Sequence, residues 1–302
     1  MAWTGCQTTL EPEDNTETPV ADKASVMTLT LEAGKIITTK ALELALDNDG
    51  EKLNAFWIQD EEVVVFAPGS ADSIGTLKAT PKEDKTKATL SGDINVTGLQ
   101  EGQTLTLLFP KKTWSYEGQS GRLLSDGNHP EWKSIEKDFD FARAEVTIKA
   151  ITTNSITTST ADFENQQSIY RFGFRHGANG PTIRTKTVLL TSDRGQLART
   201  VNAQTCVATH YATTEPMTIV LPVALTAAEA NANALIYFAL LNDNKTQDDT
   251  FSFTIYDDDG ATFKGTKLIP QTALKYSFVT ASNVGLARLE LPQGVTGVET
   301  AL

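Results

Sequence analysis

The chain has 302 residues, 40% of them hydrophobic, and a formal net charge of −12 at pH 7. A chain of this length can bury a sizeable core, and its length favours two ordinary domains over one. The acidic balance argues against a nucleic-acid binder, which needs a basic surface to displace counterions from phosphates, and against adsorption on anionic lipid. The longest apolar run, residues 234–241 (ALIYFALL), is too short to span a bilayer as a helix.

The first 25 residues predict a flexible tether. The sequence Met-Ala-Trp-Thr-Gly-Cys is followed by a segment rich in Thr, Glu, Asp and Pro, which cannot bury enough apolar surface to order itself. A Cys after Thr-Gly and before an acidic tether resembles the end of a bacterial lipoprotein signal peptide. We therefore expect Cys6 to carry a lipid, and the alternative is a free cysteine in a disordered tail.

Short apolar or alternating runs, separated by Gly, Pro, Asp and Asn, fill the first half of the chain. They lie at residues 26–31, 39–46, 55–58, 63–66, 74–77, 88–90, 105–109 and 144–151. Strands that recur with turns every 8–12 residues or so are typical of an antiparallel β-sandwich or barrel. Residues 39–46 (TKALELAL) also have a helical composition, but their alternation predicts a strand.

The second half repeats this pattern after a polar stretch at residues 152–160 (TTNSITTST), which predicts a linker. Further strands are expected at residues 169–174, 185–190, 217–223, 235–241, 251–256, 265–269, 276–279 and 286–291, with a short helix within 224–234. The run Asp257-Asp258-Asp259-Gly260 predicts a turn. The expected fold is all-β, with a tether at 1–25 and two tandem β-sandwich domains at 26–151 and 152–302.

No pattern of reactive residues stands out. His210 follows Cys206 by four residues and could share a metal with it on a helix, but further ligands are missing. The sequence has no nucleophile elbow, zinc-protease helix or phosphate-binding loop, and Asp257 to Gly260 lacks the glutamate of an EF-hand. We expect no cofactor, no metal and no enzymatic activity, although a hydrolase with carboxylates far apart in sequence stays open.

Three aromatic residues flank a glycine-rich turn at residues 118–121. Trp114, Tyr116 and Trp132 could stack on sugar rings if they are exposed, whereas a β-sandwich also needs aromatic side chains in its core. They make a surface glycan-binding protein the alternative function.

Several motifs, in a fixed order, give the first half a family resemblance. They are Trp57 followed by DEEVVVF (60–66), IGTL (74–77), ATLSG (88–92), LTLLFP (105–110), YEGQSGRL (116–123) and KDFDFA (137–142), with TKAL (39–42) before them. Together these motifs resemble the fimbrillin family of Bacteroidetes over about residues 26–150, and the likeness is diffuse beyond.

The resemblance implies a type V pilin or a pilin-like anchor or tip subunit, with two transthyretin-like domains and export as a lipoprotein. In the polymerising members a protease removes the first strand, and a donor strand from another subunit fills the groove. Here the exchangeable strand would carry Val26, Met27, Leu29 and Leu31.

The expected processing loop contains only two basic residues, Lys35 and Lys40, and the first arginine of the chain is Arg122. Cleavage in the polymerising relatives often follows an arginine. Either a different protease acts here, or the subunit is not processed and is an anchor or a tip.

The sequence thus predicts a structural or adhesive fimbrial subunit at the cell surface, held to the outer membrane only by its lipid. Its expected partners are other pilin subunits, bound by strand addition, and a surface protein or glycan; nucleic acid is not expected.

Overall fold

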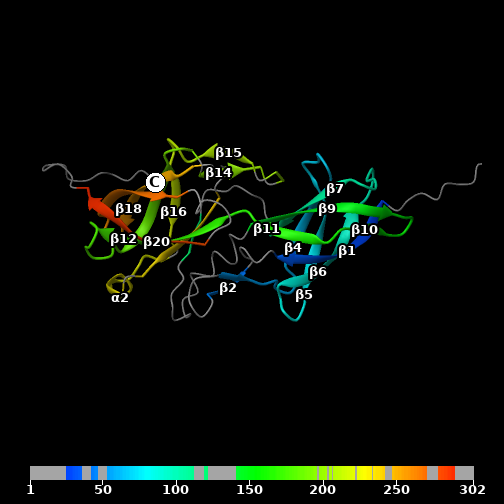
Figure 1. Cartoon of the computed structure of the whole chain (residues 1–302), viewed down its shortest axis with the longest axis horizontal. Coiled ribbons are helices and arrows are strands. Elements are labelled where there is room, and N and C mark those ends of the chain that lie inside the picture. Colours follow the sequence, from blue (N-terminus) through cyan, green and yellow to red (C-terminus); the bar gives the residue numbers. More distant parts are fainter. Residues whose placement is uncertain are drawn as a thin grey trace, which may run out of the picture.

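The computed structural model describes residues 25–35, 42–46, 53–111, 119–121 and 141–289, except 196, 203, 206, 222, 233, 242–246 and 271–277. The fold is all-β, as predicted. Among the described residues the one helix is α2 (Ala227–Asn231), which a Thr226–Glu229 capping box begins. Two lobes lie side by side along the long axis of the molecule (Figure 1).

The first lobe is built on one eight-stranded sheet. Its strands are β1 (Val26–Lys35), β4 (Glu62–Phe66), β5 (Ser73–Pro81), β6 (Lys87–Asn95), β7 (Thr104–Phe109), β9 (Ala142–Ile151), β10 (Ile156–Thr158) and β11 (Ala161–Asn165). The pairings run β1–β6–β5–β4–β7–β9, and both β10 and β11 pair with β9 on one side and β1 on the other. The sheet therefore closes on itself as a barrel, where the sequence predicted two sheets of a sandwich.

Alternating side chains of these strands fill the barrel. In β4 the residues Val63 and Val65 are fully buried between partly exposed neighbours, the period of two that the sequence showed. Trp57, just after the short strand β3 (Leu53–Ala55), is buried and makes edge-to-face contacts with Phe109 and Phe163. This large ring thereby links β7 and β11, the strands on either side of β9.

The barrel continues past the predicted domain boundary at residue 152. β10 lies in the stretch that was expected to be a linker, and Ile156 and Phe163 point into the barrel core. The connection to the next strand consists of Gln166 and the buried Gln167. The first lobe therefore ends after Asn165, because only then have the strands that close the barrel been supplied.

The second lobe is built on another eight-stranded sheet, in the order β16-β13-β18-β19-β20-β12-β17-β8. Its strands are β8 (Gln119–Gly121), β12 (Ser168–His176), β13 (Thr185–Ser192), β16 (Met217–Val220), β17 (Ile236–Leu240), β18 (Asp249–Asp257), β19 (Thr262–Ile269) and β20 (Phe278–Arg288). β8 comes from the first half of the chain, so the chain crosses between the lobes before the barrel is complete. β20 is one long strand where the sequence predicted two.

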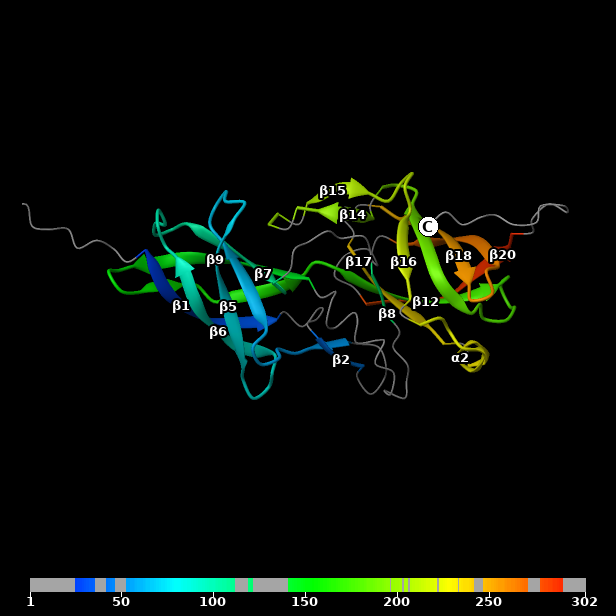
Figure 2. The same cartoon turned by 180° about the vertical axis from the view of Figure 1, so that it is seen from behind.

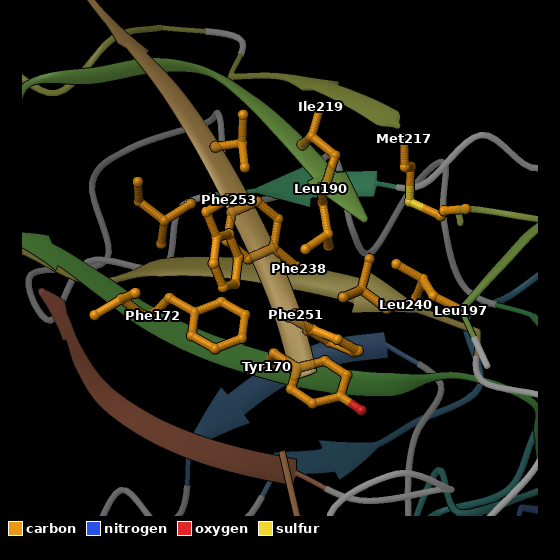
Figure 3. Packing of buried hydrophobic residues seen from close by; sticks show 14 of the residues in the cluster. Tyr170, Phe172, Leu190, Leu197, Met217, Ile219, Phe238, Leu240, Phe251 and Phe253 are labelled. Carbon is orange, nitrogen blue, oxygen red and sulfur yellow. The ribbon is translucent and has the colours of Figure 1, made fainter. Parts of the chain in front are cut away.

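The core of the second lobe is aromatic. Tyr170, Phe172, Phe238, Phe251 and Phe253 come from β12, β17 and β18 and pack against one another in tilted, edge-to-face and stacked pairs (Figure 3). The predicted turn at residues 257–260 joins β18 to β19 with Gly260 at a φ of 82°, which suits glycine. Two smaller hairpins complete the fold, β2 (Leu42–Leu46) with β3, and β14 (Ala198–Val201) with β15 (Ala208–Tyr211).

The β14–β15 hairpin connects the lobes. Its base is part of the second core, through Leu197 and Ala198. At its tip, the carbonyl oxygen of Gln204 accepts a hydrogen bond of 2.7 Å from Arg143 Nε at the start of β9, and Gln204 Nε2 donates to the carbonyl of Ser70 between β4 and β5. Figures 1 and 2 show the hairpin above the junction of the lobes. We call it the β14–β15 brace.

Apolar packing supports the brace. Leu108 on β7 and Phe141 just before β9 belong to the second core, and Phe66 at the end of β4 packs against it. The two lobes therefore share a packed junction. In the described part of the chain, no helix has the length and apolar character needed to cross a membrane.

Candidate functional site

β1 closes the barrel, and we call this strand with its neighbours β6, β10 and β11 the β1 seam. β1 pairs with β6 in antiparallel fashion from Val26 to Gly34. On its other side it runs parallel to β10, at Leu29 with Ile156, and to β11, at residues 33–35 with 161–163. All other pairings of this sheet are antiparallel. The contacts of β1 with β10 and β11 are thus the parallel part of an otherwise antiparallel sheet, and β1 is separated by more than 50 residues of chain from every strand that holds it.

The inward face of β1 is apolar. Met27, Leu29, Leu31 and Ala33 are all buried, while the residues between them are exposed. Directly across β6, these four residues face Ile94, Gly92, Leu90 and Ala88. At about 1.5–3 kcal/mol for each large side chain, the burial of Met27, Leu29 and Leu31 contributes roughly 5–9 kcal/mol. The inward face is the main reason that β1 stays in place.

The outward face of β1 is polar and matches β6 residue by residue. Thr28 Oγ1 donates to Asp93 Oδ1 at 2.6 Å, and the hydroxyls of Thr30 and Ser91 lie 2.8 Å apart. We call these contacts, together with those of Glu32 described next, the polar ladder. Exposed cross-strand pairs of this kind typically contribute about 0.2–1 kcal/mol each, so they contribute less than the inward face.

Glu32 ends the polar ladder. Its carboxylate accepts a hydrogen bond of 3.0 Å from Thr89 Oγ1 and forms an ion pair with Lys82, in the turn between β5 and β6. Hydrogen bonds from Lys82 and Thr89 lower the pKa of Glu32 below its usual value. The carboxylate is therefore ionised at neutral pH, and Lys82 lies where an acidic residue of β1 can reach it.

The structure places the predicted seam residues on both faces of β1. Met27, Leu29 and Leu31 point into the barrel, whereas Val26 is 55% exposed at the start of the strand. Lys35 is the last residue of β1. The other predicted site residues, Cys6, Lys40, Trp114, Tyr116 and Trp132, lie outside the described residues. The glycan hypothesis for the three aromatics thus stays a prediction.

The histidines that the structure describes lie apart from one another. His210 is on strand β15, where the sequence interpretation considered a helix, and its Nδ1 lies 2.7 Å from Thr200 Oγ1. His176 ends β12 and contacts Phe263. His129 and Cys206 lie outside the described residues, and within the described ranges no three His, Cys, Asp or Glu residues come together as a metal site.

Ala33, Glu32 and Lys82 are parts of the seam that were not predicted from the sequence. A signal for Ala33 and Glu32 was present, because the alternation of apolar and polar residues continues one period beyond Leu31, through residues 26–33 (VMTLTLEA). Lys82 carried no signal, because its position opposite Glu32 depends on the pairing of β1 with β6.

Comparisons with known proteins give distant structural likenesses. A candidate cell adhesion protein from Bacteroides ovatus is 16% identical, with a TM-score of 0.41, over 87% of this chain and 96% of its own. A fimbrial assembly protein from Parabacteroides distasonis is 9% identical, with a TM-score of 0.36, over 85% and 91%. The shaft pilin SpaA from Lactobacillus rhamnosus is 11% identical, with a TM-score of 0.33, over 88% and 99%.

No protein-family model and no curated protein sequence matches the chain. The structures that it resembles include cell adhesion and fimbrial proteins of Bacteroides and Parabacteroides. Both genera are Bacteroidetes, the bacteria in which the fimbrillin family occurs. The function proposed below rests on the β1 seam itself.

Proposed function

We propose that the protein is a structural or adhesive subunit of a type V fimbria and that it joins other subunits by strand addition at the β1 seam. The observation that carries this proposal is the position of β1. β1 pairs along both of its edges and so closes the barrel, yet its covalent connection to the later barrel strands starts with residues 36–41. One cut in that segment leaves β1 held by noncovalent contacts alone.

Loss of β1 creates a site for another strand. The backbone of β6 would lose its partner from Lys87 to Asn95, and β10 and β11 would lose theirs on the facing side. The buried faces of Leu90 and Ile94 would meet water. Unpaired backbone groups beside an apolar groove favour the addition of a strand from another chain, because that strand satisfies both at once.

The finer parts of the proposal follow the family resemblance. The lipid on Cys6 anchors the subunit to the outer membrane, and the cut falls at Lys35 or Lys40. The two lobes correspond to the tandem transthyretin-like units, divided after Asn165 rather than near residue 152. The partners are other fimbrial subunits and, for an adhesive subunit, a surface protein or glycan.

The test uses a chain that can be cut and locked. A specific protease site is inserted between Lys35 and Lys40, and Thr30→Cys with Ser91→Cys is introduced, in a background without Cys6 and Cys206. The two new cysteines face each other across β1 and β6, where the native hydroxyls lie 2.8 Å apart. Oxidation retains β1 after the cut, and reduction of the same sample frees it.

The expected result is that the cut and reduced chain releases β1 and forms oligomers that resist heating in detergent, whereas the cut and oxidised chain stays monomeric. A cut, reduced chain that loses β1, remains monomeric and takes up an added β1 peptide would indicate an anchor or a tip. If β1 stays in place and no strand is taken up after the cut and reduction, the proposal is wrong.

A further inference from the structure

The β1 seam varies in width along its length. At its narrow end Ala33 lies between Ala88 on β6 and Ala161 on β11, and all three are buried. We call these three residues the alanine row. One period earlier in β1, Leu31 faces Leu90, so the space changes from leucine-sized to alanine-sized within two residues.

This change in width opposes a shift of the strand by two residues. A shift by one residue turns the apolar side chains outward and is excluded in any half-buried strand. A shift by two keeps the alternation and is usually tolerated better. In the β1 seam, however, one such shift moves Leu31 into the alanine row, where overpacking is costly. The opposite shift moves Lys35 there and leaves a cavity at the place of Leu31.

The polar ladder opposes the same shifts from outside. In the observed register Glu32 meets Lys82 and Thr89, while Thr28 meets Asp93. A shift by two residues in either direction separates the acidic residue from its cation. The two faces of the seam therefore favour one register for independent reasons.

We infer that the β1 seam selects the sequence and register of the strand that it accepts. This inference rests on the proposed function, and it specifies the chemistry of the partner. The incoming strand, from another chain, presents large apolar residues at the positions of Met27, Leu29 and Leu31. It presents hydroxyl residues between them, an acidic residue opposite Lys82, and next to that an alanine-sized residue at the alanine row.

Peptide exchange into the cut full-length chain tests this inference. The chain with the inserted protease site is cut, and labelled peptides of residues 26–35 compete with the resident β1 at a urea concentration just below the unfolding midpoint. The peptides carry the native sequence, Ala33→Leu, Glu32→Lys or the native pattern moved by two residues. A second chain with Lys82→Glu is the partner for the Glu32→Lys peptide and restores the charge pair in reverse.

We expect the Ala33→Leu and shifted peptides to bind at least about tenfold more weakly than the native peptide, as the cost of overpacking implies. The Glu32→Lys peptide binds about threefold more weakly than the native peptide, as expected for the loss of an exposed ion pair, and it regains this affinity on the Lys82→Glu chain. Rescue by charge reversal separates recognition of the acidic residue from a general loss of strand stability.

Two other outcomes overturn different statements. If the native peptide exchanges and the variants exchange equally well, strand addition stands and the selection of register is wrong. If no peptide exchanges, strand addition itself fails, and the uncut chain then decides the register inference. In the uncut chain, Ala33→Leu has to lower the unfolding midpoint. The double variant Glu32→Lys with Lys82→Glu has to restore the midpoint that each single variant lowers. If either result fails, the seam has no preferred register.

Discussion

Truncation of Leu29 tests how strongly β1 holds the barrel closed. Leu29 is fully buried, faces Gly92 on β6 and pairs in parallel with Ile156 on β10. Leu29→Ala removes three carbons, about 2.4 kcal/mol of transfer free energy at 0.8 kcal/mol each. A partly unfilled cavity adds to this, so we expect the free energy of unfolding to fall by about 3–4 kcal/mol. The matched control is Val26→Ala in the same strand, where the side chain is 55% exposed and the expected change is within about 0.5 kcal/mol.

The measurement needs a reporter inside the barrel, and Trp57 provides one. It is 1% exposed between Phe109 and Phe163, so its fluorescence changes when the barrel opens. The chain has four tryptophans, and the other three, Trp3, Trp114 and Trp132, are replaced by phenylalanine. With a urea dependence of about 2 kcal/mol per molar, Leu29→Ala shifts the midpoint seen by Trp57 down by about 1.5–2 M.

The two substitutions together make the reasoning refutable. If Leu29→Ala moves the Trp57 midpoint no more than Val26→Ala does, burial of the inward face does not hold β1 in the barrel. The seam would then contribute little to closing the ring, and the estimate of roughly 5–9 kcal/mol for its three large side chains would be wrong.

Three further predictions concern charge and the junction between the lobes. Burial raises the pKa of Tyr237 despite its hydrogen bond to Arg171. The stability that comes from the neutral phenol is therefore present below about pH 10 and is lost as the pH rises through the folded-state pKa. The late ionisation is measured by subtracting the ultraviolet titration of Tyr237→Phe from that of the native chain. The pKa of Glu32 is lowered, so the stabilising effect of its carboxylate is present above about pH 4.5 and disappears as the pH falls through the folded-state pKa. The free energies of unfolding of Glu32→Gln and the native chain, measured with urea, should therefore differ at pH 7 and converge in acid. Arg143→Ala removes the hydrogen bond to Gln204, so a pair of distance labels on the two lobes should report a broader distribution of distances, while the free energy of unfolding of each lobe changes by no more than about 1 kcal/mol.

Each of these has a clear contrary result. A difference titration in which Tyr237 ionises with the exposed tyrosines would contradict its burial. A stability gap for Glu32→Gln that stays constant with pH would mean that the carboxylate gains nothing from its cation. An unchanged distance distribution in Arg143→Ala, with Lys149→Ala on the exposed face of β9 as the control, would show that the brace does not limit motion.

The strands themselves could be predicted because a period of two is a local property. The alternation of residues 26–31 gave β1, and the runs around Val63, Leu105 and Phe251 gave β4, β7 and β18. The turn at residues 257–260 was equally local, since Asp and Gly suit that backbone. For these elements, neighbouring residues carry the whole signal.

The closure of the barrel could not be predicted in the same way. It depends on β1 pairing with β6 and with β10 and β11, which are far away in sequence. The polar stretch from 152 to 160 predicts a linker, yet a three-residue strand needs only one buried residue, Ile156, to complete the wall. Pairing partners leave no mark in the local pattern, and for the same reason the role of Lys82 was missed.

The β14–β15 brace changes how the molecule responds to a pull at one end. Two bodies joined at a single point swivel freely about it, and a force on one then only reorients the other. Here the short connection through Gln166 and Gln167, with the packed junction around Leu108 and Phe141, is one attachment. The contact of Gln204 with Arg143 and Ser70 is another. Two separated attachments resist rotation of one lobe against the other. Bending the lobes toward the brace compresses it, and bending them away stretches it. We therefore expect the two lobes to bend as one unit, and the hydrogen bonds at the tip of the hairpin to break first.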